Sequence, residues 1–512
     1  MNFRFRYPHA RNSSFAFALF LCACGDGQTP TSSQANQASD RPNILWVVWD
    51  TVRADHLSLY GYERETTPQL DSWAKEAMVF ENCLSTAPIT VSSHAAMFTG
   101  LMPTETGASN AHQWLNDGFE TMAEQMSGAG YRTFAWAANP HISKEENFTQ
   151  GFETIEHPWD SAVRKEARAI VSEKVTGDRS NELGKRLRKE DVDGWTLKAA
   201  GELAEPALNK WLAAGDQTRP FFAFVNYMEA HRPLIPPRKL REKFMSPKDV
   251  DRSYQVDVSW IPMWAFNFGL SEISERDLEA IEAVYDASIL ELDGLFASLL
   301  ASLDEAGELE NTIVVLTSDH GEHLGDHHML DHQFSVFDSL LEVPLIVHFP
   351  AKFKAGRDAR PVVNYDLHPT LLELAGLQTP VDSEWGPRSL LRPADQRLRL
   401  AEFNAPFTKP FRALRKSYPD WDQAEWEQSL RALSNEQFKL IQGSAGRREL
   451  FVVGDESRDL ITEETEALDS LERALDVWVN RLKPAKQDTI PETTDAHREM
   501  LDGLGYSGED EQ

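Results

Sequence analysis

The chain is poor in cysteine, in basic residues relative to acidic ones, and in long apolar runs. Only three cysteines occur in 512 residues, so neither a disulfide framework nor a thiolate metal cluster can be built. Lysine and arginine number 51 against 81 aspartate and glutamate residues, a formal net charge of -30. Nucleic acid is not expected as a partner, because binding a polyanion needs a concentrated basic surface. The basic run at residues 185–189 is most simply a solvated helix face.

The N-terminus accounts for two of the three cysteines. Three arginines among the first eleven residues precede a short apolar stretch at residues 15–23, the pattern of a secretory signal and too short to span a bilayer. The ending LCAC at residues 21–24 resembles a bacterial lipobox, which implies cleavage before Cys24 and acylation of its thiol. The alternative is a plain cleaved signal with an incidental cysteine. No other segment suggests a membrane span.

The lipobox resemblance implies a location. Residues 1–24 would be the signal, and residues 25–41, with almost no apolar content, would be a flexible tether. We expect an exported protein that is held at the membrane of the cell envelope by its lipid anchor. In a Gram-negative cell this would place it in the periplasm or at the outer membrane.

The remaining chain has an ordinary globular composition, with 41% hydrophobic and 26% charged residues. Short apolar runs alternate with longer amphipathic segments, which indicates an α/β fold with a large, mostly parallel central sheet flanked by helices. Residues 42–390 would form this domain. The pattern then changes to short alternating runs and one late helix, so we expect a small C-terminal α+β subdomain at 391–482 and a loosely held polar tail at 483–512.

Individual elements follow from the same periodicity. Strands are predicted at residues 44–49, 133–138, 221–227, 313–316 and 345–349, and helices at 67–77, 195–213 and 275–306. Residues 160–189 and 245–269 look like insertions over the sheet edge. The second contains Trp260, Pro262, Trp264 and Phe266, which would either line a substrate mouth or pack the insertion onto its host.

Polar residues follow four of the five strands: Asp50, Asn139, the Glu229/His231 pair and the Asp319/His320 pair. Ligand crevices of open α/β sheets lie at the carboxyl ends of the strands, so these groups are expected to converge. Asp50, Asp319 and His320 would give an oxygen-rich site with one nitrogen ligand, suited to one Mn, Zn, Mg or Ca ion.

Four further histidines, His323, His327, His328 and His332, follow in the run TSDHGEHLGDHH and just beyond it. They suggest either a second metal or contacts to solvent and substrate, and His332 is the best candidate for binding an anionic group.

A hydroxyl nucleophile is suggested by ITVSSHAAMFTG at residues 89–100. The sequence from Val91 is predicted to be a helix that Ser92 or Ser93 caps, with Thr90 at its start. Backbone N–H groups at a helix start stabilise negative charge, and a bound metal lowers the pKa of a hydroxyl. The alternative is that Thr90 merely caps the helix.

These segments resemble the sulfatase family of the alkaline phosphatase superfamily. The similarity extends from residue 42 to about 482, through PNILWVVWDTVRADHLSLYGY, SSHAAMFTGLMPTETG, NTIVVLTSDHGEHLGDH and VVNYDLHPTLLELAGL among others. It implies an alkaline-phosphatase-like sandwich and one divalent metal ion held by Asp50, Asp319, His320 and Thr90, with Thr90 also the nucleophile. It also implies substrate contacts by Asn139 and His332, and by His231 as proton donor to the leaving oxygen.

The chain departs from the family at one motif. Sulfatases have Cys or Ser followed by X-Pro-Ser-Arg, which matures to formylglycine, whereas here Thr90 takes the nucleophile position, Ser92 that of proline and His94 that of arginine. Threonine cannot become formylglycine. His94 lies four residues after Thr90, on the same helical face, and would replace the anion contact of the missing arginine.

The sequence therefore favours a metal-dependent hydrolase that uses Thr90 on an anionic ester, a phosphate mono- or diester or a sulfate ester of a lipid, a glycan or a small molecule. Two alternatives stay open. One is a transferase of phospho-headgroups, although such family members usually have several membrane spans. The other is a non-catalytic binding lipoprotein of the envelope.

Overall fold

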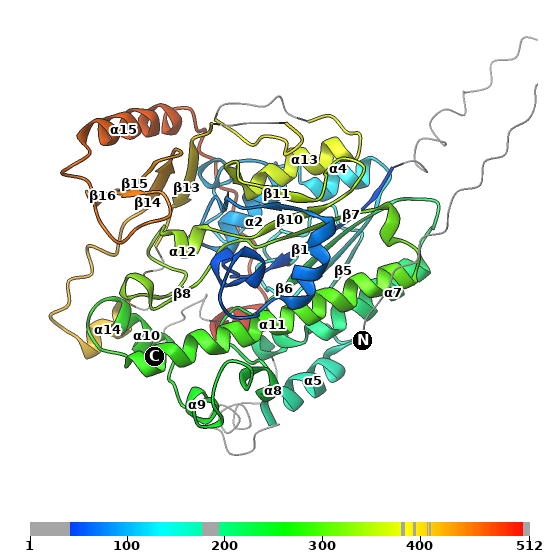
Figure 1. Ribbon diagram of the computed structural model, residues 1–512, viewed down its shortest axis with the longest axis horizontal. Helices are drawn as coiled ribbons and strands as arrows, with labels where there is room; N and C mark the ends of the chain where they lie inside the picture. The colour runs from blue at the N-terminus through cyan, green and yellow to red at the C-terminus, as the bar shows by residue number, and fades with distance from the viewer. Residues whose placement is uncertain are drawn as a thin grey trace, which may run out of the picture.

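The computed structural model describes residues 41–176, 194–379, 385–392, 396–406, 408 and 411–504. The predicted signal, Cys24, the tether up to residue 40 and the basic run 185–189 lie outside these residues. The described chain forms an α/β sandwich with a separate small antiparallel sheet (Figure 1). No helix among the described residues is both long enough and apolar enough to cross a membrane.

An eight-stranded sheet forms the centre of the sandwich. Its strands lie in the order β11 (Gly356–Asp358), β2 (Met78–Phe80), β10 (Leu345–His348), β7 (Thr312–Thr317), β1 (Asn43–Trp49), β6 (Phe221–Tyr227), β4 (Arg132–Ala137) and β5 (Thr154–Glu156). All run in one direction except β10, which is antiparallel to β2 and β7. The four strands from β7 to β4 are buried throughout, because helices cover both faces of the sheet.

The five predicted strands are confirmed with ends within one residue. The sequence did not indicate the reversed direction of β10, nor the three-residue strands β2, β5 and β11, which are too short to show periodicity.

Helices form one layer on each face of the sheet. One core contains residues of α1 (Pro68–Trp73), α5 (Arg164–Thr176), α7 (Ala204–Ala214) and α11 (Glu275–Glu305). The opposite core contains residues of α2 (Thr90–Thr99), α4 (Met122–Gly128) and α13 (Leu367–Leu374). Figure 1 shows α11 running along one side of the sheet and α4 and α13 on the other.

Two of the three predicted helices need adjustment. The helix at 275–306 is confirmed as α11, and 67–77 is α1 followed by the 3-10 turn η3 (Ala74–Glu76). The single helix at 195–213 is wrong, because this segment contains η4 (Gly194–Ala199), η5 (Gly201–Leu203) and then α7. The break brings Gly201 against the end of β6, where a Cβ would lie 2.5 Å from Glu229 Oε1.

The polar insertions pack more closely than the sequence indicated. Ala167, Val171 and Val175 of α5 are buried in the main core, so the described part of 160–189 belongs to a helical layer. Residues 245–269 form α9 (Pro247–Ser253) and α10 (Trp260–Asn267). Trp264 and Phe266 are buried, which confirms packing for these two aromatics.

Shorter elements connect the layers. The remaining helices are α3 (Pro103–Thr106), α8 (Arg238–Arg241), α12 (Asp338–Leu341) and α14 (Phe411–Ser417), with 3-10 turns η1 (Ala54–His56), η2 (Ser58–Tyr60), η6 (Leu309–Asn311), η7 (Asp326–His328) and η8 (Asn364–Asp366). Two-stranded pairs are β12 (Val362–Val363) with β3 (Cys83–Leu84), and β8 (His323–Leu324) with β9 (Leu330–Asp331).

The small C-terminal subdomain is an antiparallel sheet with one helix on it. Its strands are β13 (Arg399–Phe403), β14 (Leu430–Ser434), β15 (Phe438–Gly443) and β16 (Arg448–Val452), in that spatial order. Helix α15 (Thr465–Val479) shares a core with them through apolar side chains one or two turns apart, Leu468, Leu471, Leu475 and Trp478. This confirms the small sheet with a closing helix.

The described part of the tail, residues 483–504, is more firmly packed than the sequence suggested. It contains α16 (Asp495–Leu504), whose His497, Met500 and Leu501 are buried. The polar composition misled the prediction, because three buried side chains on one helical face are enough to dock this short helix.

Candidate metal centre and nucleophile

Three predicted metal ligands meet where two neighbouring parallel strands end. Asp50 directly follows β1, while Asp319 and His320 lie just beyond β7. One ligand atom of each lies within 4.8 Å of the others. All three residues are completely buried. Strand order alone therefore assembles the set that the sequence predicted.

The electrostatics of this set favour a cation. Burial, followed by the nearby charge of Asp319, raises the pKa of Asp50 to about 6. Burial also raises the pKa of Asp319 to about 6 and lowers that of His320 to about 3. Within the described chain, Asp50 Oδ1 and Asp319 Oδ2 have no hydrogen-bond partner. Two carboxylates, each with one oxygen that has no hydrogen-bond partner, and a neutral imidazole fit a divalent ion.

The tautomer of His320 follows from its neighbour. Its Nδ1 lies 3.0 Å from the carbonyl oxygen of Gly321, which can only accept, so Nδ1 has the proton and Nε2 a lone pair. Gly321 is required here, because a Cβ would lie 2.1 Å from the carbonyl oxygen of Ser339. The lone pair faces Thr90, whose Oγ1 lies 3.2 Å from Nε2.

Thr90 is the first residue of α2, and Ile89 is its N-cap, without a side-chain capping bond. The predicted caps, Ser92 and Ser93, lie inside the helix instead. Ser93 donates to the carbonyl oxygen of Asp319 at 2.7 Å, and Ser92 donates to that of Ala108 at 2.8 Å. The serines thus fasten α2 to neighbouring loops, and the helix start with Thr90 faces the carboxylates.

Two asparagines orient Asp50 and Thr90. Asn139 Nδ2 donates to Asp50 Oδ2 at 2.8 Å and lies 3.4 Å from Thr90 Oγ1. Asn226 Nδ2 donates to the same Asp50 oxygen at 3.2 Å. The sequence predicted that Asn139 contacts the substrate but not that Asn226 lies here, although a lone amide in the apolar strand FFAFVNY was a usable signal.

His94 is completely buried and does not present a charged donor. Its Nδ1 donates to the carbonyl oxygen of Thr90 at 3.1 Å, and its ring packs edge-on against Phe98 and Phe224. Burial lowers its pKa to about 3, so the ring is neutral. This arrangement suits a residue that holds Thr90 in place better than the predicted anion contact.

A strained residue links the ends of β1 and β7. Thr51 has φ 62°, rare for a β-branched residue. Its N–H donates to Asp319 Oδ1 at 3.2 Å, and its carbonyl oxygen accepts from the hydroxyl of Tyr285 at 2.7 Å. No local pattern identifies Thr51 or Tyr285, since Tyr285 comes from the middle of α11.

His231 and His332 complete one side of the site. The centroid of the His332 ring lies 4.7 Å from that of His320 and 5.2 Å from that of His231. Burial opposes a charge on His332, but Asp331 and Glu322 outweigh it and raise its pKa to about 9. Burial and the nearby His332 lower the pKa of His231 well below its usual value. His332 is thus the charged member of the pair.

Lys198 supports this histidine pair, a role that no sequence pattern indicated. Its Nζ donates to the carbonyl oxygens of Met228 and His231 from η4. It therefore fixes the loop that follows β6 and presents His231.

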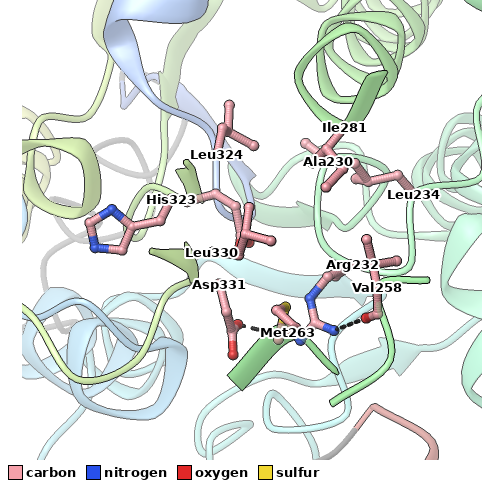
Figure 2. Close-up of a pocket in the computed structure, with 11 residues that line it drawn as sticks. Ala230, Arg232, Leu234, Val258, Met263, Ile281, His323, Leu324, Leu330 and Asp331 are labelled. Carbon is pink, nitrogen blue, oxygen red and sulfur yellow. Dashed lines mark hydrogen bonds and ion pairs between the residues drawn. The ribbon is translucent and has the colours of Figure 1, made fainter. Parts of the chain in front are cut away.

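A second cluster of possible metal ligands, which includes His332 of the histidine run, is already paired with protein cations. Glu322, Asp331 and His332 lie close enough to hold an ion. However, Asp331 Oδ2 accepts from Trp264 Nε1, and its Oδ1 lies 3.0 Å from His332 Nδ1 and 3.5 Å from Arg232. Figure 2 shows Arg232 between Asp331 and the backbone of Val258, at a cavity of about 20 Å³, which is room for one water molecule.

The other three histidines of this run are engaged outside the site. His323 lies 2.6 Å from Ser335 Oγ, while His327 stacks on Phe337 and His328 packs on Phe266. Of the aromatics proposed for a substrate mouth, Trp260 packs on Arg232, with its ring centroid 4.2 Å from the guanidinium.

Comparisons with known proteins find relatives of this chain. Residues 42–377 match the model of the sulfatase family, and residues 325–451 match that of the N-sulphoglucosamine sulphohydrolase C-terminal region. The chain is 26% identical over 371 residues to an arylsulfatase of Clostridium perfringens, which covers 66% of this chain and 76% of that one. It is 25% identical over 431 residues to an N-acetylglucosamine-6-O-sulfatase of Bacteroides thetaiotaomicron, covering 71% and 72%.

Solved structures show the same fold. A phosphonate monoester hydrolase of Agrobacterium radiobacter superposes with a TM-score of 0.64 at 19% identity, over 86% of this chain and 95% of that one. A protein in complex with its substrate D-glucosamine-2-N,6-O-disulfate superposes with a TM-score of 0.61 at 18% identity, over 88% and 100%.

Proposed function

We propose that this chain, which belongs to the sulfatase family, hydrolyses phosphate or sulfate esters with unmodified Thr90 as nucleophile. The family model covers more than half of the chain, and the protein is an ester hydrolase of this family. One observation supports the threonine mechanism above all: Thr90 Oγ1 lies 3.2 Å from His320 Nε2, beside the buried Asp50 and Asp319.

One divalent ion completes the proposal. Asp50, Asp319, His320 and Thr90 would hold it, and Mn, Zn, Mg and Ca all suit such ligands. When bound, it would lower the pKa of the Thr90 hydroxyl and neutralise charge on the transferred group.

Each residue of the site has a separate role in the proposed reaction. Thr90 releases its proton to solvent water and forms a bond to phosphorus or sulfur, while the bond to the leaving alkoxide breaks. His332 and His231 contact the substrate, and this pair delivers a proton to the leaving alkoxide. Water then cleaves the phospho- or sulfothreonine and restores Thr90. Asn139 holds Asp50 and Thr90 in register through both steps.

The choice between phosphate and sulfate depends on Thr90. Threonine cannot form formylglycine, so formylglycine-dependent sulfate hydrolysis is not proposed. An alkoxide attack suits phosphate mono- and diesters, and a phosphonate monoester hydrolase shares the fold. Sulfate esters of sugars are the second candidate, because the relatives include an N-acetylglucosamine-6-O-sulfatase.

The test is turnover by the purified, metal-replete protein with aryl phosphate mono- and diesters and an aryl sulfate, compared with Thr90→Ala. Phosphoester turnover that is lost in the variant supports the threonine mechanism. Turnover of the sulfate alone would assign the second candidate. Metal binding without turnover or phosphothreonine would favour a non-catalytic binding protein, and transfer to an added alcohol in place of water would favour a transferase.

A lipid anchor at Cys24 is a separate part of the proposal. It depends on the LCAC ending of the signal. The full-length protein, expressed in a bacterium, should partition into the detergent phase of a cloud-point extraction, and Cys24→Ser should move it to the aqueous phase. An unchanged partition would leave only a cleaved signal.

A further inference from the structure

Helix α16 docks on the carboxyl edge of the central sheet, next to the metal centre. Its Leu501 packs with Ala138 and Met228 in one small buried cluster. Ala138 follows β4 and directly precedes Asn139, and Met228 follows β6. The helix, drawn in red behind α11 in Figure 1, also packs on η4, which contains Lys198.

The segment before α16 is held at two points. The N–H of Ala485 donates to the carbonyl oxygen of Thr104 at 3.3 Å. Asn116 Nδ2 donates to the carbonyl oxygen of Lys486 at 2.9 Å, and Asn116 Oδ1 accepts from the N–H of Asp488 at 3.4 Å. These bonds hold the segment that runs from the small subdomain back to the carboxyl edge of the central sheet.

A row of buried polar groups connects α16 to Asn139. His497 Nε2 lies 3.3 Å from Glu146 Oε1, and Glu146 Oε2 lies 2.7 Å from His141 Nδ1. His497, Glu146 and His141 are each 2% exposed. The backbone N–H of His141 donates to Asn139 Oδ1 at 2.9 Å.

The last bond of this row fixes the Asn139 amide. Because Oδ1 accepts from the backbone of His141, Nδ2 is left to donate toward Asp50 and Thr90. A displaced loop at 139–147 would turn this amide away from both residues. Helix α16 is thus connected to Thr90 through four residues, His497, Glu146, His141 and Asn139.

We propose that α16 is a clamp on the active site, in which His497 is a positioning residue that holds Asn139 against Asp50 and Thr90 through Glu146 and His141. The kinetic part of this proposal rests on the proposed function. The matches to the two family models end at residues 377 and 451, and α16 lies beyond both.

Hydrogen exchange of the whole protein tests the clamp without relying on activity. His497→Ala should raise exchange at residues 139–147 by about tenfold or more. His497→Gln should stay near the wild type, because its amide can still donate to Glu146. Glu499→Ala, an exposed change on the same helix, is the matched control. Unchanged exchange in His497→Ala, or equal effects in Glu499→Ala, would overturn the clamp.

Kinetics then test the positioning role in the same four proteins. His497→Ala should lower kcat about ten- to a hundredfold with a smaller change in KM, because a misplaced reacting group costs rate rather than affinity. His497→Gln should recover most of kcat. Faster exchange with an unchanged kcat would overturn the positioning role. If the wild type hydrolyses no ester, the proposed function fails, and the exchange experiment still decides the clamp.

Discussion

Oγ1 of Thr90 lies 3.2 Å from Nε2 of His320, although 230 positions separate the two residues in the chain. The start of α2 and the end of β7 meet at this point. A hydroxyl at a helix start therefore faces an imidazole lone pair beside two buried carboxylates, which is the basis of the predictions below.

Substituting the nucleophile should abolish turnover. Thr90→Ala removes the attacking oxygen, and we expect kcat to fall by about 10⁴- to 10⁶-fold. Thr90→Ser keeps a hydroxyl at the same place and should retain measurable activity. Mass spectrometry after acid quench should find a phospho- or sulfothreonine in the wild type and none in Thr90→Ala. Turnover by Thr90→Ala above about 1% of wild type would exclude this mechanism.

Removing the His94 ring should lower the stability of the protein and leave its affinity for the substrate nearly unchanged. His94→Ala leaves the carbonyl oxygen of Thr90 without its donor and opens a cavity beside Phe98 and Phe224. We expect the free energy of unfolding in urea to fall by about 2–4 kcal/mol. Because the ring is neutral, KM for the ester should stay within about twofold. A large rise in KM at unchanged stability would instead support the anion contact that the sequence suggested for His94.

The metal-free protein should lose stability as pH rises. The pKa values of Asp50 and Asp319 are raised to about 6 from 3.8, so the folded state holds protons that the unfolded state releases. Their contribution to stability is present below pH 4 and is lost as pH rises through 6, by about 3 kcal/mol for each of the two carboxyl groups. Thermal unfolding of metal-free protein between pH 4 and 7 measures this.

A matched variant separates the contribution of Asp50 from that of all other carboxylates. Asp50→Asn removes one buried charge and should reduce the loss of stability between pH 4 and 7. It should also abolish the stabilisation that added Mn²⁺ gives the wild type at pH 7. Equal stabilisation by Mn²⁺ in both proteins would place the ion elsewhere.

The charge on His332 should set the alkaline limit of activity. Its pKa is raised to about 9 by Asp331 and Glu322 against the effect of burial, so the ring is charged below that pH. We expect kcat/KM to fall above about pH 9. Asp331→Asn should move this limb to lower pH, whereas Glu427→Gln, an exposed change, should not. An identical limb in Asp331→Asn would exclude His332 as the titrating group.

The sequence predicted the strands near the site well because each is buried on both faces. A strand such as Phe221–Tyr227 must be apolar along its whole length, and the first polar residue after it marks its end. The same reasoning found Asp50, Asn139, Asp319 and His320. It could not find Thr51, Tyr285 or Lys198, whose roles depend on contacts between distant segments.

Errors arose where a local pattern competed with tertiary contacts. Ser92 and Ser93 have the composition of helix caps, yet their hydroxyls bond to the carbonyl oxygens of Ala108 and Asp319. The polar tail looked unstructured because the few apolar residues of α16 find their partners at the ends of β4 and β6.

The sequence by itself determined the fold class, the convergence of Asp50, Asp319 and His320 and the departure at Thr90, since these depend on residue types and on positions along single strands. Only the tertiary structure decided which way His94 faces, that Asp331 and Glu322 charge His332, and that α16 returns to the active-site edge. Burial and charge at a residue depend on every segment that packs around it, and those segments are set by the fold as a whole.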